Sequence, residues 1–175
     1  LLRISNSVLD LEKLESGQFT FNPVSTDLVA LVTSTLEELR TLGVPRGVTL
    51  LLESRGPGLP RVLVDPDRAA QCVVNLVSNA IQHSPDQGTV TLRLVARPPQ
   101  VEVAVVDQGS GVPPAFRDRL FQKFQQAEGG ARGGTGLGLA ITRGLATAMG
   151  GSVDHLPGEG QPTTFVLRLP IGERG

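Results

Sequence analysis

Residues 75–83 read NLVSNAIQH, and this stretch is the most informative part of the 175-residue chain. It follows Asp65 and Pro66, an N-cap residue and a proline at the first helical position, so it lies on a predicted helix. Asn75 and Asn79 are four residues apart and therefore share one face of that helix. Because apolar residues occupy the other face, the two carboxamides are either solvated or line a polar site. An Asn carbonyl oxygen is a suitable ligand for Mg²⁺, which also retains waters and substrate phosphates.

A second informative stretch covers residues 107–113, which read DQGSGVP. Asp107 ends a strand that looks buried, and a carboxylate there can accept a hydrogen bond from an exocyclic amine. Gly109 and Gly111 would allow a flat ring to approach the backbone. The alternative interpretation is a plain tight turn.

A third stretch, residues 133–140, reads GGTGLGLA and leads into a predicted helix. Free N–H groups at a helix start, together with the helix dipole, bind phosphate without a lysine. A flexible loop packed by small residues is the alternative. The chain has no Gly-Lys pair, which excludes a Walker phosphate loop, and the glycines at 134, 136 and 138 do not match the Rossmann spacing.

The composition indicates which partners are disfavoured and which cellular location is expected. The 16 basic and 17 acidic residues give a net charge of -1, which disfavours nucleic acid and anionic membrane surfaces as partners. The single cysteine, Cys72, excludes an intrachain disulfide and favours a cytoplasmic location. The sequence shows neither a membrane-spanning stretch nor a signal peptide, so we expect no membrane contact by this chain. Because it begins with Leu1, we expect a fragment of a longer protein, whose own membrane attachment stays open.

The hydrophobic pattern predicts an α+β domain behind a helical stub. Apolar residues recur at three-four spacing over residues 1–15, which is typical either of a dimerisation helix or of a helix packed on its own domain. Further helices are predicted at 25–42, 65–82, 114–124 and 136–149, and strands at 18–22, 48–53, 61–64, 89–96, 100–107, 152–156 and 163–169. We therefore expect a two-layer α/β sandwich in which a mixed, mostly antiparallel sheet carries helices on one face.

Four stretches, in this order, resemble the sequence boxes of sensor histidine kinases. The N, first glycine, F and second glycine boxes match residues 75–80 (NLVSNA), 107–111 (DQGSG), 120–124 (LFQKF) and 134–139 (GTGLGL). Residues 9–17 (LDLEKLESG) look like the end of the dimerisation and phosphoacceptor helices of that family. The resemblance implies a Bergerat ATP-binding fold, with residues 1–17 as the end of such a helix and 18–175 as the catalytic ATP-binding domain.

The resemblance also implies a role for each matching residue. Asn79 would bind Mg²⁺, Asn75 would support the phosphates of ATP, and Asp107 would bind adenine. Arg132 would reach the γ-phosphate and act with the two asparagines as a catalytic group. The other residues implied to contact ATP are Gln82, His83, Gly109, Gly111, Lys123, Gly134, Thr135, Gly136, Leu137, Gly138 and, through water at the adenine, Thr163 or alternatively Thr164.

The lid and the reaction follow from the same resemblance. Residues 112–135 would form a movable lid anchored by Phe121 and Phe124. The related gyrase, mismatch-repair and heat-shock ATPases have, at the position of Asn75, a Glu that activates water. An amide has no useful proton affinity at neutral pH, so the resemblance implies phosphoryl transfer to a protein nucleophile rather than hydrolysis.

One departure from the family supports an alternative. Gln82 stands where many sensor kinases have a phosphate-binding Lys, and Arg132 or Lys123 would have to compensate for the missing cation. The alternative is a degenerate nucleotide-binding or regulatory module without kinase activity. A serine kinase of the anti-sigma type on the same fold ranks last, because the helical opening segment favours a histidine partner within the same protein.

The implied partners are ATP, the phosphoacceptor and dimerisation domain of the same protein, and a cognate response regulator, with a homodimeric parent protein. Neither His83 nor His155 lies in the sequence context of a phosphoacceptor. The acceptor would therefore lie upstream of Leu1, and we expect this fragment alone to bind ATP without phosphorylating itself.

Overall fold

The computed structural model describes residues 2–55, 58–123, 137–156 and 163–173. In chain order its elements are α1 Leu2–Glu15, β1 Val24–Thr26, α2 Leu28–Leu42, the 3₁₀ turn η1 Pro45–Gly47, β2 Thr49–Arg55, β3 Val62–Val64, α3 Pro66–His83, β4 Thr89–Arg97, β5 Gln100–Val106, the 3₁₀ turn η2 Pro114–Arg119, α4 Gly138–Ala148, β6 Ser152–Leu156 and β7 Thr164–Pro170.

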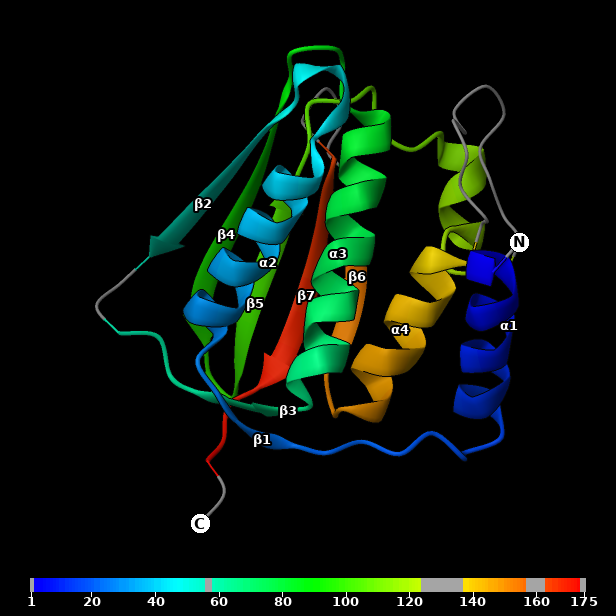
Figure 1. The fold of residues 1–175 in the computed structure, drawn as a ribbon, viewed down its shortest axis with the longest axis vertical. Coiled ribbons are helices and arrows are strands. Elements are labelled where there is room, and N and C mark those ends of the chain that lie inside the picture. Colours follow the sequence, from blue (N-terminus) through cyan, green and yellow to red (C-terminus); the bar gives the residue numbers. More distant parts are fainter. Residues whose placement is uncertain (1, 56–57, 124–136, 157–162, 174–175) are drawn as a thin grey trace.

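The main sheet has the strand order β2-β4-β5-β7-β6. Only the β2–β4 pair is parallel among the pairs of this sheet in the described residues, and the other pairs are antiparallel. Figure 1 shows α2, α3 and α4 lying over one face of the sheet, with α1 outside α4. The prediction of a mixed, mostly antiparallel sheet with helices on one face is therefore confirmed.

The core lies between this sheet and α3. The strand β5 alternates buried Val101, Val103 and Val105 with residues that are only half-buried, which is the pattern of a strand with one face in the core. The helix α3 contributes a fully buried apolar stripe that includes Leu76 and Val77. The remaining face of α3 is left for the polar residues of the candidate site.

The opening helix α1 packs on α4. Leu11 is only 8% exposed and belongs to the core. A Cβ atom placed on Gly144 of α4 would lie 3.1 Å from Cδ1 of Leu14, so the two helices approach closely at this glycine. The end of α1 is thus fixed to the domain, whereas Leu9 on the same helix is 52% exposed.

The segment between α1 and α2 differs from the prediction. Residues 18–22 do not form a strand; β1 lies further on and pairs with β3, with Val24 opposite Val64. The predicted helix at 25–42 begins only at Leu28, because Asp27 caps it by accepting a hydrogen bond from the N–H of Ala30. The pairing with a strand some forty residues away overrides the local helical pattern here.

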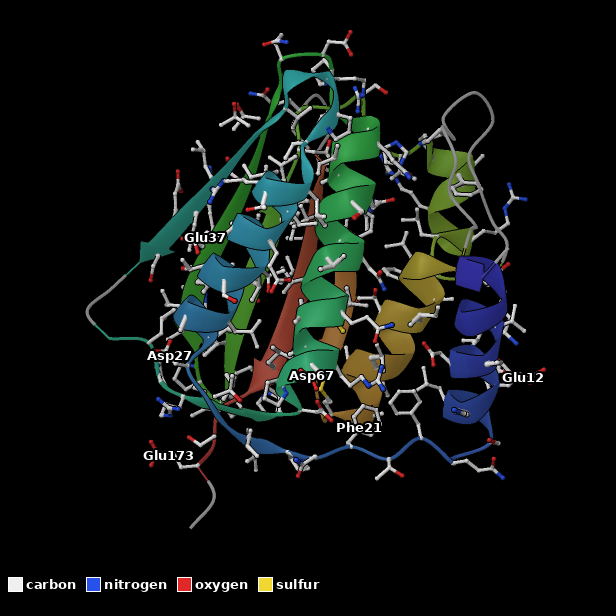
Figure 2. The ribbon with its side chains drawn as sticks, viewed as in Figure 1. Glu12, Phe21, Asp27, Glu37, Asp67 and Glu173 are labelled. Atoms are coloured by element: carbon white, nitrogen blue, oxygen red, sulfur yellow. The ribbon has the colours of Figure 1, made fainter. Side chains whose placement is uncertain are left out.

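The segment before β1 is packed by aromatic side chains. Phe21 packs against the core near the end of α4, whereas Glu12, Glu37 and Glu173 are exposed (Figure 2). The ring of Phe21 lies 4.9 Å from that of Phe19. Residues 18–22, for which a strand is predicted, are therefore held by these aromatic contacts.

Candidate functional site

The buried carboxylate of Asp107 is the first feature of the site. It follows β5 directly and is fully inaccessible to solvent. Its Oδ1 accepts a hydrogen bond from the N–H of Gly109 at 2.8 Å, whereas no residue in the described part of the chain donates to Oδ2. Burial raises the pKa of the Asp107 carboxyl to about 6, and the hydrogen bond from Gly109 acts in the opposite direction. This carboxylate therefore retains an unused acceptor atom inside the protein.

Thr163 lies beside Asp107 although the two are far apart in sequence. The backbone N–H of Asp107 donates to the carbonyl of Thr163 at 3.0 Å. The Thr163 side chain is 5% exposed, and its Oγ1 has no hydrogen-bond partner in the described residues. A Cβ atom on Gly111 would lie 3.6 Å from this hydroxyl. An unpaired carboxylate oxygen and an unpaired hydroxyl therefore lie close together behind residues 107–111.

Such a pair is a sign of a ligand site. Buried polar atoms without a partner are rare and each costs about 1–3 kcal/mol, so their presence calls for an explanation. An exocyclic amine would donate to Oδ2 of Asp107, and the hydroxyl of Thr163 would bond a ring nitrogen or a bound water. The residues present therefore fit adenine.

At Gly109 the loop that follows β5 lies directly against the end of α3. A Cβ atom at this position would overlap the carbonyl oxygen of His83 and lie 2.9 Å from Oδ1 of Asp107. Because the His83 oxygen belongs to the backbone, the loop would have to move. Only glycine permits the observed approach of the loop to α3.

We expect Gly109→Ala to weaken ATP binding roughly 10- to 100-fold, since a displacement of about 1 Å at a site is enough for such a loss. Isothermal titration calorimetry with a non-hydrolysable ATP analogue measures the effect. Ser110→Ala, at the exposed neighbour, is the matched control and should bind as the parent chain does. Unchanged affinity of Gly109→Ala would show that the loop does not form part of the site.

The polar face of α3 carries Asn75, Asn79 and Gln82, all half-buried, and the more exposed His83 at its end. The Asn75 amide nitrogen lies 3.2 Å from Oγ1 of Thr142 and 3.4 Å from the carbonyl of Gly138, both on α4. The side chains of the other three make no hydrogen bond or ion pair with any described residue. Within the described part of the chain, the polar atoms of these three side chains are therefore left for a ligand.

The phosphate end of the predicted site is described only in part. Leu137 is fully buried before the first residue of α4, Gly138. Lys123 forms an ion pair with Glu15 of α1 rather than lying free. Phe121 packs edge-on against Phe165 with ring centroids 6.2 Å apart. The other expected residues, Phe124, Arg132, Gly134, Thr135 and Gly136, lie outside the described residues.

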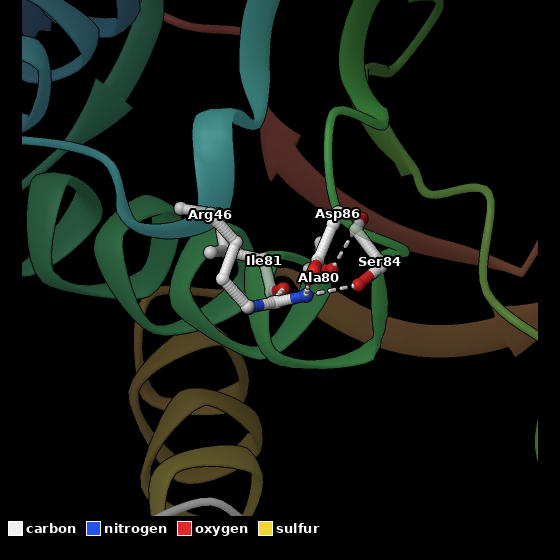
Figure 3. Close-up of polar contacts among 5 residues, drawn as sticks. All are labelled: Arg46, Ala80, Ile81, Ser84 and Asp86. Atoms are coloured by element: carbon white, nitrogen blue, oxygen red, sulfur yellow. Dashed lines mark hydrogen bonds and ion pairs between the residues drawn. The ribbon is translucent and has the colours of Figure 1, made fainter.

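The end of α3 is held by Arg46, a residue that the sequence analysis did not single out. Its guanidinium donates to the backbone carbonyls of Ile81 and Ser84 and forms an ion pair with Asp86 (Figure 3). The carbonyls at a helix C-terminus lack partners within the helix, and a basic side chain satisfies them. Arg46 has a positive φ of 57°, which places it in a turn just before Gly47. A basic residue in a turn is too common a pattern for sequence alone to reveal this role.

Replacing Arg46 with Ala should lower the free energy of unfolding by about 1–3 kcal/mol, because the carbonyl of Ser84 loses its donor and that of Ile81 keeps only the N–H of Ser84. Denaturant titration followed by circular dichroism measures it. Arg97→Ala is the control: that side chain is 69% exposed and makes a surface ion pair with Glu102, so its loss should cost under about 1 kcal/mol. Equal effects of the two substitutions would contradict the capping role.

A second tether was also missed. The side-chain oxygen of Gln108 accepts a hydrogen bond from the N–H of Thr89 at 2.9 Å. The site loop is thereby attached to the start of β4, next to the turn that Arg46 holds.

Comparisons with known proteins agree with this geometry. Residues 64–173 match the model of the family described as histidine kinase-, DNA gyrase B- and HSP90-like ATPase. The chain belongs to this ATPase family. Within it, the similar proteins are sensor kinases: the virulence sensor protein BvgS of Bordetella bronchiseptica is 38% identical over 99% of this chain, and the signal transduction histidine-protein kinase BarA of Escherichia coli is 36% identical over 98%. These alignments span only 15% and 19% of the two relatives.

A solved relative extends the likeness to three dimensions. The structure of full-length ShkA in complex with AMPPNP superposes with a TM-score of 0.85 at 29% identity, covering 99% of this chain and 36% of ShkA. The chain is thus a catalytic ATP-binding domain of the type found in sensor histidine kinases. In the part of the chain that the structure describes, no helix has the length and apolarity to cross a membrane.

Proposed function

We propose that this ATPase-family domain binds Mg²⁺ and ATP and transfers the γ-phosphate to a histidine on the dimerisation helix of its parent protein. The similarity to BvgS and BarA supports the kinase assignment, and the AMPPNP in the ShkA complex supports the nucleotide. A cognate response regulator would receive the phosphoryl group next. We further propose a homodimeric parent and a cytoplasmic location for this domain.

The observation that carries the proposal is the pair of unpaired buried atoms, Oδ2 of Asp107 and Oγ1 of Thr163. They lie behind Gly109, which packs against the carbonyl of His83, and Gly111, where a Cβ atom would lie 3.6 Å from the Thr163 hydroxyl. We assign adenine recognition to these four residues. A carboxylate accepts from the 6-amino group of adenine, whereas guanine presents a carbonyl oxygen at that position and would be repelled.

The phosphates would lie between α3 and the start of α4. We assign Mg²⁺ to Asn79, with Asn75 beside it, because amide oxygens suit this ion and phosphates complete its shell. When bound, Mg²⁺ would offset the charge of the phosphate oxygens. Backbone N–H groups at the N-terminus of α4 would bind the phosphates, with Arg132 at the γ-phosphate.

The chemistry follows from what the side chains near the phosphates can do. Asn75 cannot remove a proton from water, so the domain holds ATP without hydrolysing it efficiently. An imidazole nitrogen of the acceptor histidine then attacks the γ-phosphorus. The bond from phosphorus to the β–γ bridging oxygen breaks, ADP leaves with the electron pair, and the imidazole proton passes to solvent. Catalysis rests on placement and charge neutralisation.

Gln82 supports a second candidate function. Gln82 is neutral and stands where many sensor kinases have a phosphate-binding Lys. Lys123, which could replace that charge, forms an ion pair with Glu15. A regulatory module that contacts a kinase without binding nucleotide would have this property. The two functions predict opposite results in a binding experiment.

The first experiment is calorimetry of the chain with AMPPNP, with and without Mg²⁺. Binding strengthened by Mg²⁺ supports the proposed function, and the absence of both heat and thermal shift favours the regulatory module. The second experiment adds the chain and γ-labelled ATP to the separately produced dimerisation segment of the parent protein. Acid-labile, base-stable label on that segment supports histidine transfer, and its absence despite ATP binding would contradict the kinase assignment.

A further inference from the structure

A chain of hydrogen bonds connects α3 to α4 through Thr142, which is fully buried. The Thr142 hydroxyl donates to the carbonyl of Gly138 at 2.7 Å. The amide nitrogen of Asn75 reaches the same hydroxyl at 3.2 Å and the same carbonyl at 3.4 Å. The three groups therefore form a closed triangle between the asparagine face of α3 and the first residue of α4.

The donors and acceptors in this triangle determine how the Asn75 carboxamide is turned. A backbone carbonyl only accepts hydrogen bonds, and the single proton of the Thr142 hydroxyl is already given to Gly138. Both neighbours of Asn75 are thus acceptors, so its NH₂ group must face α4. The planar amide then has its oxygen Oδ1 on the edge that α4 does not occupy, and no described residue donates to that oxygen.

We propose that Thr142 is a positioning residue that holds the NH₂ group of Asn75 against α4, so that the amide oxygen, and not the NH₂ group, is left for the ligand. The proposal rests on the proposed function, since it assumes that Asn75 lies beside Mg²⁺ and ATP. An oxygen cannot donate to a phosphate. It accepts from a water or binds a cation, so Asn75 would support the phosphates, as the family resemblance implied, through the metal and its waters.

This arrangement is particular to a hydroxyl-bearing side chain at position 142. Valine has nearly the same shape but cannot accept from Asn75, so it leaves the amide with only the 3.4 Å contact to Gly138. Serine keeps the hydroxyl and loses one methyl group. The pair Thr142→Val and Thr142→Ser therefore separates hydrogen bonding from packing.

The test combines a spectroscopic signal of the nucleotide-free chain with binding. In ¹⁵N-labelled protein the side-chain NH₂ signal of Asn75 is assigned by its disappearance in Asn75→Asp. We expect Thr142→Val to shift or broaden that signal, whereas Thr142→Ser leaves it close to its original position. In calorimetry with AMPPNP, Thr142→Val should reduce the affinity gained from Mg²⁺ by about tenfold, with metal-free affinity nearly unchanged.

Several outcomes would overturn the proposal. They are an unchanged Asn75 signal in Thr142→Val, equal losses of affinity with and without Mg²⁺, and a Thr142→Ser variant that behaves like the valine variant. If Thr142→Val fails to fold, Thr142→Ala provides the same comparison against serine. If the unsubstituted chain binds no AMPPNP, the proposed function is refuted. The NMR signal of Asn75 then still decides whether Thr142 orients the amide.

Discussion

Asp107→Asn is expected to weaken ATP binding by about a hundredfold, which corresponds to the loss of one hydrogen bond to a charged group and the repulsion of a second donor. The substitution is nearly isosteric. Asn can keep the acceptor oxygen that bonds the N–H of Gly109, but it places an NH₂ group where the unpaired Oδ2 now lies. That NH₂ group would face the amino group of adenine. Competition between ATP and GTP analogues measures the result, and preference for adenine should fall with affinity.

The pH dependence of binding provides a matched test. The pKa of the Asp107 carboxyl is raised to about 6 by burial, so the carboxylate is lost as the pH falls below that value. ATP affinity of the parent chain should therefore decrease more steeply on acidification than that of Asp107→Asn. Titration of the phosphates is common to both proteins and cancels in the comparison. Parallel profiles, or unchanged base selectivity, would show that Asp107 does not bind adenine.

Without nucleotide, the Asp107 carboxyl should have the opposite effect on acidification, because it should increase the stability of the fold. Its folded-state pKa of about 6 exceeds the ordinary value of 3.8, so the folded chain binds more protons than the unfolded chain between these two pKa values. The free energy of unfolding should rise by about 3 kcal/mol from this group as the pH falls through that window. Asp107→Asn should remove this contribution and be at least as stable as the parent chain at neutral pH. Denaturant titrations at several pH values measure both effects.

Asn79→Ala is expected to abolish most of the strengthening of ATP binding by Mg²⁺. Removal of a group that merely supports a metal ligand costs roughly 10- to 100-fold in metal affinity, and the loss of a ligand should cost at least as much. Metal-free binding of ATP should change little, because the Asn79 side chain makes no hydrogen bond or ion pair with any described residue. Calorimetry with AMPPNP across a series of Mg²⁺ concentrations measures the linkage.

The control for this variant is Gln71→Ala, two turns earlier on α3, whose side chain bonds Arg68. It should retain the Mg²⁺ effect in full. If Asn79→Ala reduced binding equally in the presence and absence of Mg²⁺, the residue would contact ATP directly or support the fold, and the metal assignment would be wrong.

The regular elements could be predicted where the signal is local. The helix from Pro66 has an N-cap, a proline and a continuous apolar stripe, and the prediction to residue 82 differs from the structure by one residue. The β4–β5 hairpin likewise follows its alternating pattern. The prediction failed at residues 18–28, because the pairing of β1 with β3 depends on residues that are distant in sequence. Asp65 also holds this segment, since its Oδ2 accepts a hydrogen bond from the N–H of Asn22.

The site shows the same division. The sequence determined the chemical types: amides four apart on a helix, a carboxylate before two glycines and a glycine stretch before another helix. These chemical types depend on short-range periodicity and on the backbone freedom of glycine, both of which are properties of the local sequence. The tertiary structure alone decided that Arg46 caps α3 and that Thr142 turns the amide of Asn75. Those contacts join residues tens of positions apart, and only the packing of the helices on the sheet determines which side chains meet.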